Sequence, residues 1–222
     1  VVLTGAGDRA FCAGADLGRG GGTFSGRDRQ AQRSAEAPRP TLYPYQIDKP
    51  VIAALNGHAI GVGITYPMLA DVRFVAENAK LAFVFVRRGV LPELASHVIL
   101  TRVIGLSRAA ELLLSGKTIS GSEAAQMGLV SRALPQADVL PAALAMAHDI
   151  AANTAPASVA VAKRLLWDGM SLTVPEMMRR ENPAFAWLGN QADAREGVTS
   201  FLEKRTPKWT LTTADVPKNL IE

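Results

Sequence analysis

The stretch GHAIGVGITYP, residues 57–67, decides the fold and raises the question of function. Three glycines fall within seven of its residues, and the other positions are mostly apolar. Apart from His58 and Thr65, it contains no acid, base or nucleophile. Glycine allows positive φ angles and lets a ligand approach the backbone closely. A stretch so poor in reactive side chains points to backbone groups as its functional elements.

A second glycine turn, CAGAD at residues 12–16, has the same character. If a helix begins after GVG (residues 61–63), its first N–H groups lack partners within the helix and lie at its positive dipole end. Two such turns side by side could direct two backbone N–H groups at one oxygen, which is an oxyanion hole. The alternative interpretation is tight packing of strands against helices, which also uses glycine.

The order of apolar segments indicates an α/β fold. The chain has 222 residues, of which 48% are hydrophobic and 20% charged, so it can bury a sizeable core. We expect buried strands in VVLTGAG (1–7) and KPVIAALNG (49–57), and one or two more in DVRFVAENAKLAF (71–83). The uncharged run 51–70 is long enough to span a membrane, but its glycines and Pro67 favour a buried strand followed by a buried helix.

The last third of the chain has a helical composition. Pro141 suits the first turn of a helix, and the residues that follow it are nearly all helical in pattern, interrupted by Pro175 and Pro183. We therefore divide the chain into an α/β core, residues 1–140, and a helical C-terminal region, residues 141–222.

Charge and cysteine content restrict the class of protein. Cys12 is the single cysteine, which excludes an internal disulfide and indicates a reducing compartment, so we expect a cytoplasmic protein. The three histidines have no metal-ligand spacing, and we expect no bound metal. The net charge of +4 fits a small anionic ligand such as a phosphate, and we expect neither a nucleic-acid partner nor a membrane span. No secretory signal is visible, and a chain that opens in a strand without Met suggests an upstream part.

Two local patterns suggest a dinucleotide-binding enzyme or a serine hydrolase, but the residues around each pattern do not fit that class. GAGDRA, residues 5–10, matches the dinucleotide-binding fingerprint G-x-G-x-x-A, but the glycine-rich stretch after it cannot form the helix that this fingerprint must open. Ser96 and His97 are adjacent, so they do not face each other on a helix, and no G-x-S-x-G motif is present. Glu93 in GVLPELASH is either a solvated acid in the first turn of a helix or a catalytic acid.

Four longer stretches form a specific combination. They are VVLTGAGDRAFCAGADL (1–17), KPVIAALNGHAIGVGITYPMLADVRFVAENAKLAF (49–83), RRGVLPELASHVILTRVIGLSRAAELLLSGKTISGSEAAQMGLVSRALP (87–135) and EGVTSFLEKRTPKW (196–209). Together and in this order they resemble the crotonase family, the enoyl-CoA hydratase/isomerase superfamily. The resemblance implies a ββα spiral core with a C-terminal helical trimerisation region, and assembly as a homotrimer or dimer of trimers. It implies an acyl-CoA substrate, no cofactor beyond the coenzyme A moiety, and opening strands of the family that are missing here.

The resemblance also assigns roles around the two glycine turns. By motif position, the backbone N–H groups of Ala15 and Val62 hold the thioester oxygen of the coenzyme A ester. Thr65 and Phe85 stand where hydratases of the family carry two glutamates, and neither can act as a general base at pH 7. Glu93 stands where a branch similar to peroxisomal Δ3,Δ2-enoyl-CoA isomerases keeps its single catalytic glutamate.

Further positions are implied to bind the coenzyme A moiety. In the family, the adenine lies against the backbone of the CAGAD loop, here Ala13, Asp16 and Leu17. Phe201 and Lys204 in SFLEKR match residues that cover the nucleotide, often from a neighbouring subunit. Thr65 and Phe85 complete the expected substrate-binding set.

The sequence leaves four activities open, in a definite order. We favour movement of a double bond from C3–C4 to C2–C3, because one carboxylate can take a proton from C2 and return one to C4. The second interpretation is hydration, with Glu93 alone activating water. The third is an acyl-CoA-binding protein without turnover, because two acids are absent. A dinucleotide-dependent oxidoreductase comes last.

Overall fold

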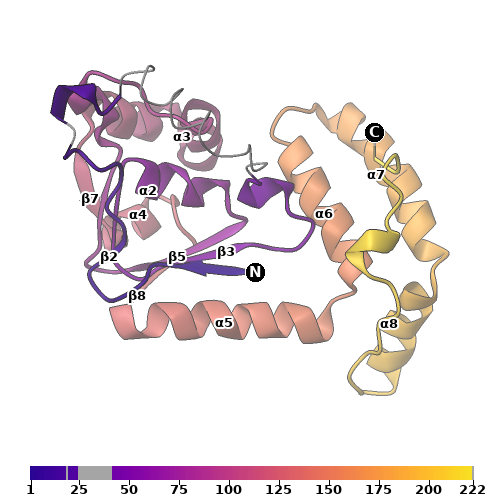
Figure 1. The fold of residues 1–222 in the computed structure, drawn as a ribbon. Helices are drawn as coiled ribbons and strands as arrows, with labels where there is room; N and C mark the ends of the chain where they lie inside the picture. Colours follow the sequence, from indigo (N-terminus) through magenta and orange to yellow (C-terminus); the bar gives the residue numbers. More distant parts are fainter. Residues whose placement is uncertain (19, 25–41, 222) are drawn as a thin grey trace, which may run out of the picture.

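The computed structural model describes residues 1–18, 20–24 and 42–221 (Figure 1). Within these residues the strands form two four-stranded sheets, with the orders β1-β3-β5-β8 and β2-β4-β6-β7. The strands are β1 (Val2–Thr4), β2 (Ala10–Cys12), β3 (Ile52–Leu55), β4 (His58–Ile60), β5 (Val72–Ala76), β6 (Lys80–Ala82), β7 (Thr118–Ser120) and β8 (Arg132–Leu134).

From β1 to β6, successive strands alternate between the two sheets. The first sheet is parallel throughout, with Ile52 of β3 paired to Val2 of β1 on one side and to Val72 of β5 on the other. In the second sheet β2, β4 and β6 are parallel, and β7 closes the edge in the antiparallel direction. The chain therefore winds as a spiral from β1 to β6, and the predicted ββα spiral core is confirmed.

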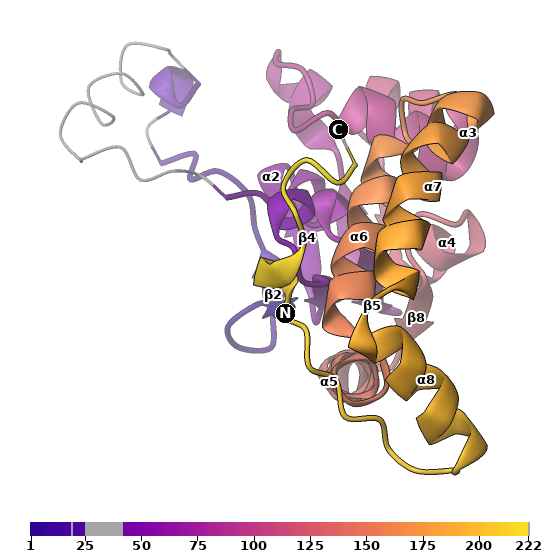
Figure 2. The same ribbon diagram turned by 90° about the vertical axis from the view of Figure 1, so that its right-hand side faces the viewer.

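The helices divide into those that pack on the sheets and those that stand beside them. Helix α5 contacts all four strands of the first sheet, α4 contacts strands of both sheets, and α2 packs on β2 and β4. Figures 1 and 2 show α6, α7 and α8 as a separate group at one side of the sheets. The helices are α2 (Val62–Thr65), α3 (Ser96–Ser115), α4 (Gly121–Gln126), α5 (Gln136–Asn153), α6 (Pro156–Asp168), α7 (Val174–Gly189) and α8 (Ala192–Leu202). Short 3-10 turns are η1 (Gly20–Gly22), η2 (Pro44–Gln46), η3 (Pro67–Leu69), η4 (Val84–Arg88) and η5 (Thr213–Asp215).

The hydrophobic core lies around β3. All four of its residues are at most 1% exposed, because the strand is central in its sheet and covered on both faces. The uncharged run around it is thus buried in a globular core, and no helix in the described part of the chain is long and apolar enough to cross a bilayer. The run holds one more element than predicted, because His58–Ile60 forms β4 between β3 and α2.

Two prolines that were predicted to open or to interrupt helices lie inside helices. Helix α5 begins at Gln136, after Pro135, so Pro141 lies inside it and does not open it. The predicted division at residue 140 thus falls within a helix that packs on the first sheet. Pro183 lies inside α7 and does not interrupt it. Proline removes one N–H donor, which a long helix with other contacts can tolerate.

A buried ion pair ties the C-terminal helices to the core. Lys163 of α6 is 4% exposed, and its Nζ lies 2.8 Å from Oδ2 of Asp71 at the start of β5. Lys163 also donates hydrogen bonds to the carbonyl oxygens of Pro44 and Lys49, at 2.8 and 3.0 Å. Asp71 accepts a further bond from Trp167 Nε1 at 2.7 Å. Every donor of this ammonium therefore has a partner.

Lys163→Met should lower the free energy of unfolding by about 3 kcal/mol. Removing one member of a buried pair leaves the other charge without its counter-ion, and this costs more than the pair itself contributes. Urea unfolding followed by circular dichroism measures the change. The matched control is Lys117→Met, because Lys117 pairs with Glu111 at 2.6 Å on the surface, with side chains 37% and 55% exposed. That variant should lose less than about 1 kcal/mol, and equal losses in the two variants would contradict the account.

Candidate active site

Two glycines hold the predicted turns against each other. A Cβ atom on Gly14 would lie 2.6 Å from the carbonyl oxygen of Ile60, and one on Gly63 would collide with the carbonyl oxygen of Cys12. Gly14 also has a φ of +93°, a conformation that favours glycine. The loop after β2 and the turn into α2 therefore touch through their backbones, as the sequence predicted.

The two turns leave backbone donors free. Gly61, with a φ of +58°, precedes α2, and its carbonyl oxygen accepts bonds from the N–H groups of Ile64 and Thr65. The N–H groups of Ala15 and Val62 find no acceptor among the described residues. Val62 is the first residue of α2, where a helix offers its N–H without an internal partner.

Both of these residues line one cavity of about 630 Å³, and Glu93 lines it too. Six of the predicted site residues are brought together here, namely Ala13, Ala15, Leu17, Val62, Phe85 and Glu93. The rest of the lining is mostly apolar and comprises Gly14, Phe24, Ile60, Gly61, Val84, Arg88, Gly89, Val90 and Leu91. Arg88 and Glu93 are the charged members of the described lining.

Glu93 is held by an unusual turn ahead of α3. Leu94 and Ala95 both have a φ of +56°, which is rare for residues other than glycine. Ser96, fully buried, closes the turn, because its hydroxyl and its N–H donate to the carbonyl oxygen of Glu93 at 2.5 and 3.2 Å. Strained backbone of this kind gathers at functional sites. Glu93 is therefore not a solvated acid in the first turn of α3, because it precedes that helix and lines a cavity.

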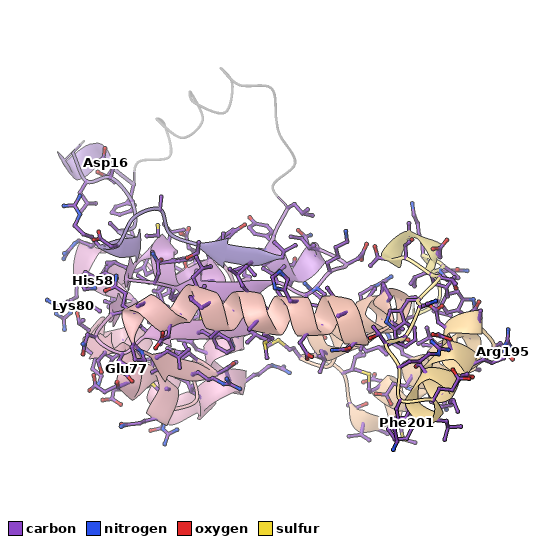
Figure 3. All side chains as sticks on the ribbon, turned by 90° about the horizontal axis from the view of Figure 1, so that it is seen from below. Asp16, His58, Glu77, Lys80, Arg195 and Phe201 are labelled. Carbon is purple, nitrogen blue, oxygen red and sulfur yellow. The ribbon has the colours of Figure 1, made fainter. Side chains whose placement is uncertain are left out.

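Four predicted residues do not line this cavity. The exposed side chain of Asp16 accepts a bond from the N–H of Gly18 at 2.8 Å, which shapes its own loop. Thr65 is fully buried, and its hydroxyl has no partner among the described residues. Phe201 of α8 is 82% exposed, and Figure 3 shows it at the opposite end of the molecule from Asp16. Lys204 follows the same helix.

Phe85 of η4 and Glu93 were predicted, but the other lining residues from this part of the chain were not, namely Val84, Arg88, Gly89, Val90 and Leu91. Arg88 ends η4, and Gly89 follows with a φ of +72° that turns the chain toward Glu93. The signal was the tripeptide RRG ahead of VLPE, whose glycine marks a turn. Phe24, beside the segment of residues 25–41 that lies outside the described residues, carried no such signal.

The arrangement suits chemistry at a carbonyl group. Two N–H groups without an acceptor among the described residues, on residues that line one cavity, can stabilise negative charge on a bound oxygen if both are directed at it. A carboxylate on the same cavity can accept a proton and return it. Because most of the wall is apolar, water is largely displaced by a bound ligand, and the electrostatic interactions inside become stronger.

Known proteins are similar to this chain in both sequence and fold. The family model described as enoyl-CoA hydratase/isomerase matches residues 1–212. An enoyl-CoA hydratase of Alternaria alternata is 39% identical over 94% of this chain and 70% of its own length. The 2,3-dehydroadipyl-CoA hydratase of Escherichia coli is 33% identical over 93% of this chain and 78% of its own length.

Solved structures agree with these sequence matches. A probable enoyl-CoA hydratase/isomerase from Mycobacterium abscessus is 42% identical, with a TM-score of 0.82 over 94% of this chain and 78% of its own. An enoyl-CoA hydratase from Bacillus anthracis is 33% identical, with a TM-score of 0.83 over 94% of this chain and 80% of its own. With sequence and fold in agreement, the chain belongs to the enoyl-CoA hydratase/isomerase family.

Proposed function

We propose that the protein adds water to the double bond of trans-2-enoyl thioesters of coenzyme A. The observation that carries the proposal is the single cavity shared by Glu93 and the free N–H groups of Ala15 and Val62. The names of the relatives favour hydration over the isomerisation that the sequence analysis preferred.

The proposed reaction needs one carboxylate and two backbone donors. The thioester oxygen accepts hydrogen bonds from Ala15 and Val62. Glu93 takes a proton from water, the hydroxide formed attacks C3, and the electrons of the double bond move onto the thioester as an enolate. Glu93 then returns its proton to C2, so that the sum is the addition of one water molecule.

Isomerisation is the second candidate, and one observation favours it. Glu93 is the one carboxylate on the described lining, while Thr65 is buried away from the cavity and Phe85 lines it as an aromatic ring. The same Glu93 would take a proton from C2 of a 3-enoyl thioester and return it to C4. Hydration passes through the enolate of a 3-hydroxyacyl thioester and isomerisation through a dienolate, but both place negative charge on the thioester oxygen, where the same two N–H groups would stabilise it.

Turnover of matched substrates separates the candidates. Purified protein is given trans-2-hexenoyl-CoA and trans-3-hexenoyl-CoA, and the products are separated by liquid chromatography against authentic standards and weighed by mass spectrometry. Hydration predicts a product heavier by one water from the 2-enoyl thioester. Isomerisation predicts the 2-enoyl thioester from the 3-enoyl one, with unchanged mass. Tight binding of both thioesters without conversion would contradict the proposal and favour a non-catalytic acyl-CoA-binding protein.

We further propose that the chain works as a homotrimer or dimer of trimers, with Phe201 and Lys204 serving the coenzyme A site of a neighbouring subunit. Large apolar side chains on α7 and α8 support this, because Phe185, Phe201 and Leu202 are 80%, 82% and 72% exposed. Such a concentration of exposed apolar side chains is uncommon on a monomer. Sedimentation equilibrium should give three or six times the chain mass, and a monomer at micromolar concentration would contradict it.

A further inference from the structure

Two adjacent arginines at the end of η4 differ in what they contact. The Nε of Arg87 donates to the carbonyl oxygen of Ser115 at 2.7 Å, and its side chain lies against Gly116. Ser115 is the last residue of α3, so Arg87 caps the negative end of that helix. The role of Arg87 is thus accounted for by the fold.

Arg88 has no comparable structural partner. Arg88 is one of the residues that line the cavity, and within the described residues the one polar contact of its side chain is with the carbonyl oxygen of Arg87, at 3.1 Å. No carboxylate of the described chain forms an ion pair with it, and this includes Glu93 on the same cavity. Most of a guanidinium group therefore remains available to a ligand.

We propose that Arg88 binds an anionic oxygen group of the substrate, and so helps to set which acyl-CoA the site accepts. The inference rests on the proposed function, because it takes the cavity as the thioester site. A guanidinium group presents planar paired donors that match a carboxylate or a phosphate. Two parts of the ligand could supply that group: a carboxylate at the far end of the acyl chain, or a phosphate of coenzyme A.

Arg88 is the one cation of the described lining, so an anionic group of a ligand is favoured beside it. The lining residues near Arg88 in the chain are mostly apolar and include Val84, Val90 and Leu91. Arg88 is exposed, so its interaction with a bound anion strengthens to the extent that the ligand displaces water around it. Loss of a hydrogen-bonded charge at such a contact typically weakens binding at least about tenfold.

The test uses saturated thioesters, so it does not depend on turnover. Calorimetry measures the affinity of hexanoyl and adipoyl groups, which have the same length but differ in the terminal carboxylate. Each is presented on coenzyme A and on pantetheine, which lacks the nucleotide phosphates. The proteins compared are the parent, Arg88→Gln, Arg88→Lys and the matched control Arg87→Gln.

The outcomes distinguish the source of the anion. If the acyl carboxylate is the partner, Arg88→Gln should weaken adipoyl thioesters at least about tenfold more than hexanoyl ones, on both carriers. If a phosphate is the partner, both coenzyme A thioesters should weaken alike, and neither pantetheine thioester should change. Arg88→Lys should recover part of the loss. The inference is overturned if the four affinities of Arg88→Gln match those of Arg87→Gln. A parent protein that binds no coenzyme A thioester overturns the proposed function as well.

Discussion

Replacing Glu93 by Gln should lower kcat at least about 100-fold on whichever enoyl-CoA the protein converts. This is the lower end of what a general acid–base group contributes. The amide keeps the size of the side chain and removes the proton acceptor, while the backbone donors of Ala15 and Val62 stay in place. KM should therefore change little. Steady-state kinetics on the better of the two hexenoyl-CoA substrates measures both values.

The control is the same substitution at a carboxylate outside the cavity. Glu77 is an exposed residue between β5 and β6 and does not line the cavity, so Glu77→Gln should keep the parent rate. Thr65→Ala and Phe85→Leu should cost far less than Glu93→Gln, because neither residue carries a transferable proton. A Glu93→Gln variant that works at the parent rate would remove the proposed mechanism and leave the family assignment intact.

Replacing Gly63 by Ala should nearly abolish turnover. The new Cβ would collide with the backbone carbonyl of Cys12, and neither backbone can yield without moving the turns that carry Ala15 and Val62. Displacing one oxyanion donor typically costs about 10²–10³ in rate, and this single change displaces the pair. Steady-state kinetics gives the loss, and thermal unfolding shows how much stability is lost with it.

Gly189→Ala is the matched control for the glycine change. A Cβ on Gly189 meets nothing within 4 Å, and this residue ends α7, far along the chain from the cavity. The variant should keep its activity and its melting temperature, since Ala is the better helix former. A Gly63→Ala protein with parent activity would mean that the contact between the two turns does not position the donors.

The sequence predicted the parts of the site that depend on local backbone chemistry. The glycine turns at residues 12–16 and 57–67 implied a close approach of backbone to backbone, and the structure has it at Gly14 and Gly63. Glu93 could be placed because the surrounding motif resembles a known family. A dinucleotide-binding site at GAGDRA was excluded correctly, because strand β2 follows this motif where such a site needs a helix.

The features that could not be predicted from the sequence depend on tertiary contacts. Strand β4 is three residues long and exists because β2 and β6 pair with it on either side, and so short a segment has no periodicity of its own. The left-handed turn at Leu94 and Ala95 was invisible, because nothing in their residue types favours positive φ. Arg88 and Arg87 look alike in sequence, and only packing against α3 separates their roles.

The most direct test of the central claim is the infrared absorption of a bound substrate carbonyl. Hexanoyl-CoA labelled with carbon-13 at the thioester carbonyl is bound to the parent protein, and the isotope-edited band is compared with that of the free ligand. If the N–H groups of Ala15 and Val62 hold this oxygen, the band should move to lower frequency on binding. It should move equally in Glu93→Gln and should stay at the free-ligand position in Gly63→Ala. A band that does not move when the parent protein is saturated would contradict the account, because the thioester oxygen would then lie outside the two donors.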